Sequence, residues 1–236
     1  MSFTQSARSN RLSSSIKKGA RRALPIVLGY VPIGMAFGLL AQQTKLGVWP
    51  TLGLSVFVFA GAAQFMAVSM MAGGAAAAVI VSTAFIVNFR HVLMSASLSP
   101  MLVSWGKLQR TALGWMLTDE SFALHSVYFA GGDVEPAPAI ALNVTAYLSW
   151  AAAGMAGYRL GALIESPETW GVDFALPAMF IGLLIPTCKN RPAVTAALCG
   201  GGASVALHLS GAGSWAAFLG ALVGATAGTL AWGDDS

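Results

Sequence analysis

Charged residues are scarce in this sequence. Asp, Glu, Lys and Arg make up 9% of its 236 residues, whereas a soluble globular protein carries about 25%. No charged residue occurs from Leu46 to Phe89 or from Pro192 to Gly233. As helices, each of these stretches is long enough to cross a hydrocarbon core of about 30 Å twice. The composition all but excludes a water-soluble protein and predicts an all-α polytopic membrane protein.

Cysteine and the usual signatures of soluble enzymes are also scarce. The two cysteines, Cys188 and Cys199, lack the CxxC spacing of redox and zinc sites. The sequence contains no phosphate loop, no HExxH pair and no GxSxG elbow. An ATP-driven pump and a soluble-type enzyme are therefore unlikely to be encoded here, and we expect neither a metal nor another cofactor.

The basic residues gather at one end of the chain. Six of the 13 lie in the first 22 positions: Arg8, Arg11, Lys17, Lys18, Arg21 and Arg22. Because this cluster precedes the apolar body, we interpret residues 1–22 as a basic cytoplasmic tail that sets orientation, and not as a nucleic-acid-binding segment. Residues 23–233 are then expected to form a single transmembrane transport domain, with Ala23 to Ala41 as a retained first helix.

Hydropathy divides the body into eight apolar segments separated by Gly and Pro turns. Basic loops tend to stay in the cytoplasm, so Lys107 and Lys189 are expected on the side of the N-terminus and the loop of Asp133 outside. Eight full crossings violate this pattern. We therefore expect two segments to re-enter, the one broken at Gly61 and the one from Phe174 to Pro186. About six full and two partial crossings, one partial crossing in each half, are compatible with an inverted-repeat transporter.

Breaks in the first two apolar segments are candidate binding elements. Pro25 and Pro32 in the first helix predict an unwound stretch with free carbonyl groups, and a merely kinked helix is the alternative. In the second segment, Gln64 lies deep in an apolar run, three residues after Gly61. A buried amide needs a partner, so Gln64 is expected either to link two helices or to face a substrate.

Ionisable residues interrupt the third and fourth apolar segments. Arg90, with Asn88 beside it, is costly within a membrane unless it is paired, faces water or snorkels to the surface. Its guanidinium group could grip a carboxylate with two hydrogen bonds. Asp119 and Glu120 lie near the middle of the fourth segment, and adjacent side chains diverge by about 100° on a helix. One acid is therefore expected to pair with Arg90 while the other exchanges a proton. An ion pair that only orients helices is the alternative.

The last apolar segment carries a ridge of small residues. Gly220, Gly224 and Gly228 recur at four-residue spacing, which is typical of a close-packing helix face. We predict that this ridge contacts a partner subunit, although the spacing alone does not distinguish a second protein from another helix of the same chain.

Taken in order, these features resemble the large subunit of the azaleucine-resistance (AzlC-type) branched-chain amino acid permeases. The resemblance is carried by five stretches: Pro25 to Gly38, Phe59 to Gln64, Asn88 to Arg90 with Met94 and Ser97, Thr118 to Phe122, and Asp173-Phe174 with Pro177 and Phe180. It implies an exporter of branched-chain amino acids, and in some relatives methionine, in the bacterial inner membrane. It also implies a partner, a small AzlD-type membrane subunit.

We therefore predict a proton-coupled secondary transporter, and not an enzyme, that moves an apolar amino acid outward across the lipid bilayer. The predicted substrate-binding residues are Pro32, Gly61, Gln64, Asn88 and Arg90, and the predicted proton-coupling residues are Asp119 and Glu120. Two rival hypotheses are an intramembrane enzyme that uses the two acids with His91 or His125, and a channel for a small solute, which needs no coupling acid.

Overall fold

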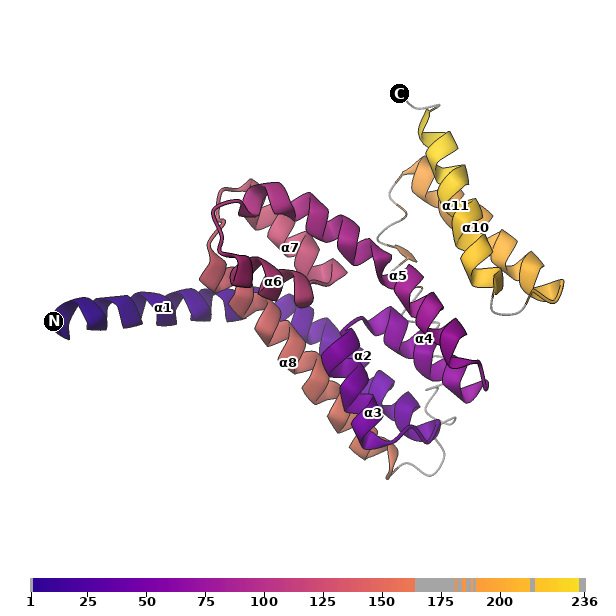
Figure 1. Ribbon diagram of the computed structural model, residues 1–236, viewed down its shortest axis with the longest axis horizontal. Helices are drawn as coiled ribbons and strands as arrows, with labels where there is room; N and C mark the ends of the chain where they lie inside the picture. Colours follow the sequence, from indigo (N-terminus) through magenta and orange to yellow (C-terminus); the bar gives the residue numbers. More distant parts are fainter. Residues whose placement is uncertain are drawn as a thin grey trace. The chain divides into compact units, whose positions relative to one another are not determined.

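The computed structural model describes residues 2–163, 181, 184–185, 188, 190–212 and 215–233. These residues form helices joined by short turns, with no strand among them, which confirms the all-α class predicted from the sequence (Figure 1). The chain forms two compact units, Met1–Asp173 and Phe174–Ser236. The segment from 23 to 233, which we expected to act as one transport domain, is thus divided between them.

The centre of unit 1 is a pair of parallel helices, α2 (Leu24–Gln43) and α8 (Pro136–Gly161). A Cβ added to Gly34 of α2 would lie 2.9 Å from the Cβ of Ala153, and one added to Gly38 would overlap the carbonyl oxygen of Gly154. Later positions of α2 thus face later positions of α8, so the two helices run in the same direction. Their glycines let the backbones approach closely, as is typical of helix packing in membranes.

Basic residues of α1 (Ser2–Arg22) bind the loop that precedes α8. Lys18 Nζ lies 2.8 Å from Asp133 Oδ2, and Arg22 also pairs with this carboxylate. Arg22 additionally lies over the ring of Tyr128, 3.8 Å from its centroid. We call this face of unit 1, marked by Lys18, Arg22 and Asp133, the N-face. The expectation that the Asp133 loop lies on the side opposite the N-terminus is wrong, because the basic tail pairs with it directly.

Residues 107–130 form a re-entrant hairpin, here called hairpin 2, made of α6 (Lys107–Trp115) and α7 (Asp119–Ala130). The indole of Trp105, just before α6, donates a hydrogen bond of 3.1 Å to the carbonyl of Val134, just after α7. Both ends of hairpin 2 therefore lie at the N-face. The fourth apolar segment was not one of the two that we expected to re-enter, and this expectation is wrong: nine- and 12-residue helices reach only about 14 and 18 Å.

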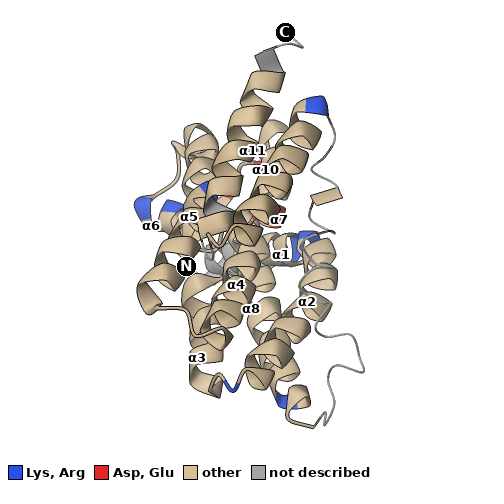
Figure 2. Cartoon of the chain, turned by 90° about the vertical axis from the view of Figure 1, so that its right-hand side faces the viewer, with Lys and Arg blue, Asp and Glu red and all other residues tan. Residues whose placement is uncertain are grey.

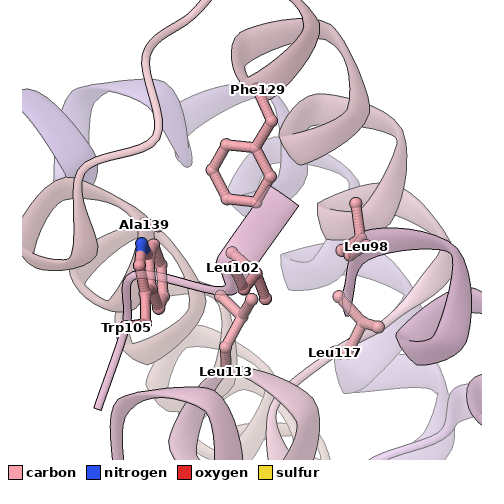
Figure 3. Packing of buried hydrophobic residues seen from close by; sticks show 7 residues of the cluster. All are labelled: Leu98, Leu102, Trp105, Leu113, Leu117, Phe129 and Ala139. Atoms are coloured by element: carbon pink, nitrogen blue, oxygen red, sulfur yellow. The ribbon is translucent and has the colours of Figure 1, made fainter. Parts of the chain in front are cut away.

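A buried apolar cluster anchors hairpin 2 at the N-face (Figure 3). It joins α6 and α7 to the end of α5 (Ala77–Leu98), to the short helix η2 (Ser99–Leu102) and to α8. Its members are Leu98, Leu102, Trp105, Leu113, Leu117, Phe129 and Ala139. Burying a large apolar side chain contributes about 1.5 to 3 kcal/mol relative to leaving it in water, so this cluster holds the hairpin closed at its base.

Residues 48–72 form a second re-entrant element, here called hairpin 1. It consists of α3 (Val48–Gly53), the π-helical turn η1 (Leu54–Val58) and α4 (Gly61–Ala72). The chain breaks at Phe59, whose φ is 40°, and at the extended Ala60. Because α5 ends at the N-face and its 22 residues span about 33 Å, α5 begins at the opposite face, where α2 ends. Hairpin 1 therefore enters and leaves at this far face, as expected for the segment broken at Gly61.

The described part of unit 1 thus combines three long apolar helices, α2, α5 and α8, with two short hairpins that enter from opposite faces. Length and apolar composition mark Leu24–Gln43, Ala77–Leu102, Pro136–Gly161 and Arg191–Leu209 as candidate membrane spans among the described residues. Uncharged residues predominate along the helices in Figure 2. The other expected re-entrant segment, Phe174 to Pro186, lies outside the described residues except for three positions.

Unit 2 contains an antiparallel helix pair, α10 (Arg191–Leu209) and α11 (Trp215–Gly233). A Cβ on Gly224 would lie 3.0 Å from the Cα of Gly200, and one on Gly228 would lie 2.9 Å from the Cβ of Ala196. Gly220 packs equally closely against Ser204. The glycine ridge therefore contacts α10 of the same chain, and our assignment of Gly220, Gly224 and Gly228 to a partner contact is wrong because this face is already occupied.

Candidate functional site

The tips of the two hairpins meet at Tyr30 of α2. Its hydroxyl oxygen lies 2.7 Å from Thr118 Oγ1 and 2.7 Å from Glu120 Oε2, both at the tip of hairpin 2. Its ring lies edge-on to that of Phe59 at the tip of hairpin 1, with the centroids 6.4 Å apart. The hairpins enter from opposite faces, so this meeting point lies near the middle of the membrane.

A capping motif shapes the tip of hairpin 2. Thr118 is the N-cap of α7, and its backbone N–H donates to Ser121 Oγ at 2.9 Å. In return, the backbone N–H of Ser121 donates to Thr118 Oγ1 at 3.4 Å. This reciprocal pair satisfies donors that a helix start leaves free. Asp119 and Glu120 occupy the first turn, where the positive end of the helix dipole favours acids.

Arg90 of α5 forms an ion pair with Asp119. Arg90 Nη1 lies 3.0 Å from Asp119 Oδ2, and the two side chains are 38% and 41% exposed. Within the described residues, Arg90 Nε and the nearby Asn88 Oδ1 are buried without a hydrogen-bond partner. The guanidinium group therefore keeps a donor that a second acceptor can use.

The two neighbouring acids point to different helices. Asp119 binds Arg90 of α5, while Glu120 contacts Tyr30 of α2. This divergence follows from the rotation of about 100° per helical residue. The carboxylates of Asp119 and Glu120 thus connect the tip of hairpin 2 to α5 and α2.

Gln64 lies at the tip of hairpin 1. It is fully buried, and its Nε2 donates to Ser55 Oγ across the break, at 3.4 Å. Gln64 Oε1 and the indole nitrogen of Trp150 are buried without a partner in the described part of the chain. No hydrogen bond described in unit 1 joins Gln64, at the tip of hairpin 1, to Arg90, which lies on α5 beside the tip of hairpin 2.

Aromatic residues of α8 support hairpin 1. A Cβ added to Gly61 would lie 2.9 Å from the Trp150 ring, so glycine is needed where the indole covers the break. Tyr147 donates a hydrogen bond of 2.9 Å from its hydroxyl to the carbonyl of Val56. This bond satisfies a carbonyl of the π-helical turn, where hydrogen bonding departs from the α pattern.

Pro32 does not join the site. The stretch from Pro25 to Pro32 is helical within α2, so the expected unwinding is wrong. In an apolar medium a helix keeps its remaining backbone hydrogen bonds, because free polar groups there are costly, and only the carbonyl of Leu28 loses its usual donor to Pro32. Pro32 itself is exposed on the side of α2, which argues against a role in binding substrate.

Tyr30 is a site residue that the sequence pattern does not reveal, although it lies between Pro25 and Pro32. The sequence pattern also gives no sign of the hydrogen bond that links His125 to α8. His125 Nε2 lies 2.8 Å from Asn143 Oδ1, and Asn143 Nδ2 donates to the carbonyl of Leu113 at 3.2 Å. This buried bridge joins α6, α7 and α8. His125 is therefore occupied in holding hairpin 2 and makes no described contact with the two acids.

A cavity of about 280 Å³ opens beside hairpin 2, between the end of α5 and α6. Four leucines of the buried cluster form its apolar part, and Ser95, Thr111 and Arg110 add polar groups. Arg110 also donates from Nε to the carbonyl of Trp105 at 3.1 Å, which places the cavity at the N-face. Ser95 lies five residues from Arg90 on α5, so the cavity lies between the N-face and the Arg90–Asp119 pair.

The segment that contains both hairpins also matches a known protein family. A family model described as AzlC protein matches residues 25–164, which is more than half of the chain. The chain belongs to the AzlC family. The matched segment runs from the start of α2 to just beyond the end of α8.

Several proteins that are similar to this chain are membrane or transport proteins by name. Inner membrane protein YgaZ of Escherichia coli is 31% identical, over 83% of each chain. An uncharacterized membrane protein of Archaeoglobus fulgidus is 29% identical over 94% of this chain and 96% of its own. The branched-chain amino acid transport protein AzlC of Bacillus subtilis is 25% identical, over 78% of this chain and 72% of its own. No solved structure matches the chain.

Proposed function

We propose that this chain is the large subunit of a secondary transporter that exports branched-chain amino acids and is driven by the proton gradient. The substrate class is supported by the name of the Bacillus subtilis relative. The observation that carries the proposal is the ion pair of Arg90 and Asp119 at 3.0 Å, beside the point where the hairpin tips meet. Ionisable residues inside membrane segments are expensive, and they usually mark a substrate or ion pathway.

Arg90 is the proposed partner of the substrate carboxylate. Guanidinium and carboxylate groups can form two parallel hydrogen bonds, and Arg90 Nε has no described partner. The incoming carboxylate competes with Asp119 for this group. The acid pair, released from Arg90, then binds the substrate ammonium group. Two ion pairs with the substrate thus replace the pair of Arg90 and Asp119, and no charge is left unpaired.

The amide groups near the break extend the proposed site. α4 begins at Gly61, and helix N-termini at membrane depth attract the anionic group of a substrate. Gln64 Oε1 and Asn88 Oδ1 are free acceptors in the described structure, suited to an ammonium group. The side chain of an aliphatic amino acid would pack among the aromatic residues around Phe59.

Proton coupling follows from the competition for Arg90. An acid that loses its cationic partner in an apolar setting is favoured in its neutral form. When substrate leaves, the pair of Asp119 and Glu120 loses the ammonium group and therefore takes up one proton, and it gives the proton back when the next substrate binds, as export driven by an inward proton gradient requires. Substrate and proton occupancy are thus linked through the same guanidinium group.

The two hairpins supply the proposed route. Each separates the site from one face, and each is only about half a membrane thick, so a small tilt of either tip opens one side. Alternate opening of elements around a fixed central site is the usual scheme of secondary transporters. The cavity beside Ser95 and Arg110 serves as the entrance from the N-face, which the basic tail assigns to the cytoplasm of a bacterial inner membrane.

A small AzlD-type membrane subunit is proposed as the partner. This part of the proposal rests on the sequence resemblance alone, since the glycine ridge of α11 packs within the chain. The proposed subunit can therefore bind to any apolar face of the described helices that lipid would otherwise cover.

Transport in reconstituted vesicles tests the proposal. The chain, alone and with an AzlD-type subunit, is inserted into vesicles loaded with labelled valine, and a pH gradient is imposed. Valine efflux that follows the gradient supports the exporter. Efflux that ignores the gradient would point to a channel, and chemical conversion of a lipid or peptide would point to an enzyme. Full export by the chain alone would remove the partner subunit from the proposal.

A further inference from the structure

Glu120 belongs to a chain of hydroxyl groups that runs along the tip of hairpin 2. Glu120 Oε2 lies 2.7 Å from the hydroxyl of Tyr30, which lies 2.7 Å from Thr118 Oγ1. Thr118 Oγ1 lies 3.4 Å from Ser121 Oγ, which donates to the carbonyl of Thr118 at 3.2 Å. Tyr30, Thr118 and Ser121 are all buried.

Counting hydrogen atoms shows what this chain can do. Tyr30 carries one hydroxyl hydrogen but has two oxygen neighbours at 2.7 Å, so it donates to one and accepts from the other. When Glu120 is ionised, Tyr30 donates to the carboxylate and Thr118 donates to Tyr30. When Glu120 is protonated, its hydrogen points to Tyr30, Tyr30 donates to Thr118, and Thr118 donates to Ser121.

Every hydroxyl group is thus satisfied in both states of Glu120, because the O–H bonds of Tyr30 and Thr118 rotate while Ser121 keeps donating to the carbonyl of Thr118, and no heavier atom moves. This matters because leaving a polar group unpaired in a buried site is costly. Asp119 has no such chain. Its described charged partner is Arg90, which has only hydrogens to donate and therefore favours the ionised acid.

The charges around Glu120 come from two elements. Arg90 and His91 approach from α5, and His91 is within electrostatic reach of both acids. Asp119 precedes Glu120 on α7, and the uncharged Tyr30 faces it from α2. A proton bound by two neighbouring acids rests on the acid whose neutral form is better hydrogen-bonded.

We infer that Glu120 is the acid that binds and releases the coupling proton, with Tyr30 and Thr118 as positioning residues whose hydroxyl groups reverse direction at each protonation. This inference rests on the proposed function and divides its two acidic roles. Asp119 stays ionised, first as the partner of Arg90 and then as the partner of the substrate ammonium group. Glu120 gives up the proton when substrate arrives and takes one up when substrate leaves.

Infrared spectroscopy of the whole chain in lipid tests the proton site without any transport. A protonated carboxylic acid has a carbonyl band that its ionised form lacks, and the band frequency reports hydrogen bonding. Spectra recorded as the pH is lowered are compared for the unaltered chain, Glu120→Gln and Asp119→Asn. Glu135→Gln serves as the matched control, because Glu135 is exposed and makes no capping hydrogen bond.

We expect one buried carbonyl band to grow with acidification, to vanish in Glu120→Gln and to persist in the other two variants. Tyr30→Phe keeps the ring contacts and removes the hydroxyl group, so its band should persist at a shifted frequency. A band that vanishes in Asp119→Asn but not in Glu120→Gln, the absence of any titrating band in the unaltered chain, or an unshifted band in Tyr30→Phe would each overturn the inference.

Vesicle transport separates this inference from the proposed function. Glu120→Gln should reduce the stimulation of valine efflux by a pH gradient at least ten-fold, whereas the control Glu135→Gln should keep it. If the unaltered chain moves no amino acid while the carbonyl band behaves as expected, the proposed substrate fails and the proton site stands. If Glu120→Gln keeps full gradient-driven export, the proton site fails and the proposed function stands.

Discussion

Lys18 Nζ lies 2.8 Å from Asp133 Oδ2, although 115 positions separate the two residues in the sequence. This contact places the end of α1, the start of α2 and the turn between α7 and α8 on one face of unit 1. It reverses the side that loop charges alone assigned to Asp133, and it agrees with the return of hairpin 2 to the face where it began.

The first prediction concerns this arrangement in the membrane. Single cysteines at Lys107 and Gly132, in a chain from which Cys188 and Cys199 are removed, should react with a membrane-impermeant maleimide from the same side. A cysteine at Gly74, in the turn between α4 and α5, should react from the other side. Labelling of positions 107 and 132 from opposite sides would contradict the re-entrant assignment of hairpin 2.

The second prediction concerns pH. Hydrogen bonds from Lys18 and Arg22 hold the pKa of Asp133 below its usual value, which is about 3.9. The resulting stabilisation is fully present above the usual pKa and disappears as the pH falls through the lowered one. Asp133→Asn should lower stability at neutral pH by no more than about 1 kcal/mol and flatten its acid dependence. Thermal unfolding in detergent between neutral and acidic pH measures both effects, and an unchanged acid dependence in the variant would contradict the pairing.

The third prediction concerns the contact of α2 with α8. A Cβ on Gly38 would overlap the backbone of Gly154, whereas one on Gly29 of the same helix would meet nothing within 4 Å. Gly38→Ala should therefore destabilise unit 1 by about 1 to 3 kcal/mol through overpacking. Gly29→Ala is the matched control and should unfold like the unaltered chain. Equal unfolding of the two variants in detergent would argue against the parallel pair.

The fourth prediction concerns the glycine ridge. Gly224 is buried against Gly200 of α10, while the next residue, Ala225, is exposed. Gly224→Leu should lower the unfolding temperature of the chain expressed alone, and Ala225→Leu should leave it unchanged. A loss of binding to the small subunit by Gly224→Leu, with unaltered stability of the isolated chain, would instead restore the ridge as a partner contact.

The fifth prediction concerns substrate binding. Arg90→Ala removes the proposed carboxylate partner, and a hydrogen bond to a charged group contributes about 1.5 to 3 kcal/mol, so valine affinity should fall roughly 10- to 100-fold. Arg110→Ala is the control, because Arg110 lies at the N-face and its Nε is already bound to Trp105. Binding is measured calorimetrically in detergent. Unaltered affinity in Arg90→Ala would remove Arg90 from the site and with it the proposed mechanism.

The sequence predicts the fold class and the first hairpin well because both depend on local composition. Long uncharged stretches need an apolar surrounding, and the small residues around Gly61 mark a break. The same reasoning failed for Pro32, since proline removes only one hydrogen bond and the rest of α2 remains helical in packing against α8. A proline is thus weak evidence for unwinding in a helix that packs against a neighbouring helix along its whole length.

Hairpin 2 was missed because its break contains neither Gly nor Pro. The turn at Leu117 depends on contacts with Leu98 and Trp105 that are distant in the sequence, and hydropathy averages across it. One local signal was present: Thr118 to Ser121 has a helix-starting pattern, with two acids in the first turn. The role of Tyr30 could not be found in this way, because its contact with Glu120 spans 90 positions.

Hairpins that stop halfway also expose the site to the electrical field of the membrane. From Ala130 at the N-face to Glu120, α7 spans 11 residues, or about 16 Å, which is about half of the hydrocarbon core. One elementary charge crossing the whole membrane gains about 2.3 kcal/mol per 100 mV. A proton that reaches Glu120 from either face therefore crosses about half of that voltage drop, whereas the zwitterionic substrate carries no net charge. The membrane potential thus acts on the protonation step and leaves the binding of the amino acid almost untouched.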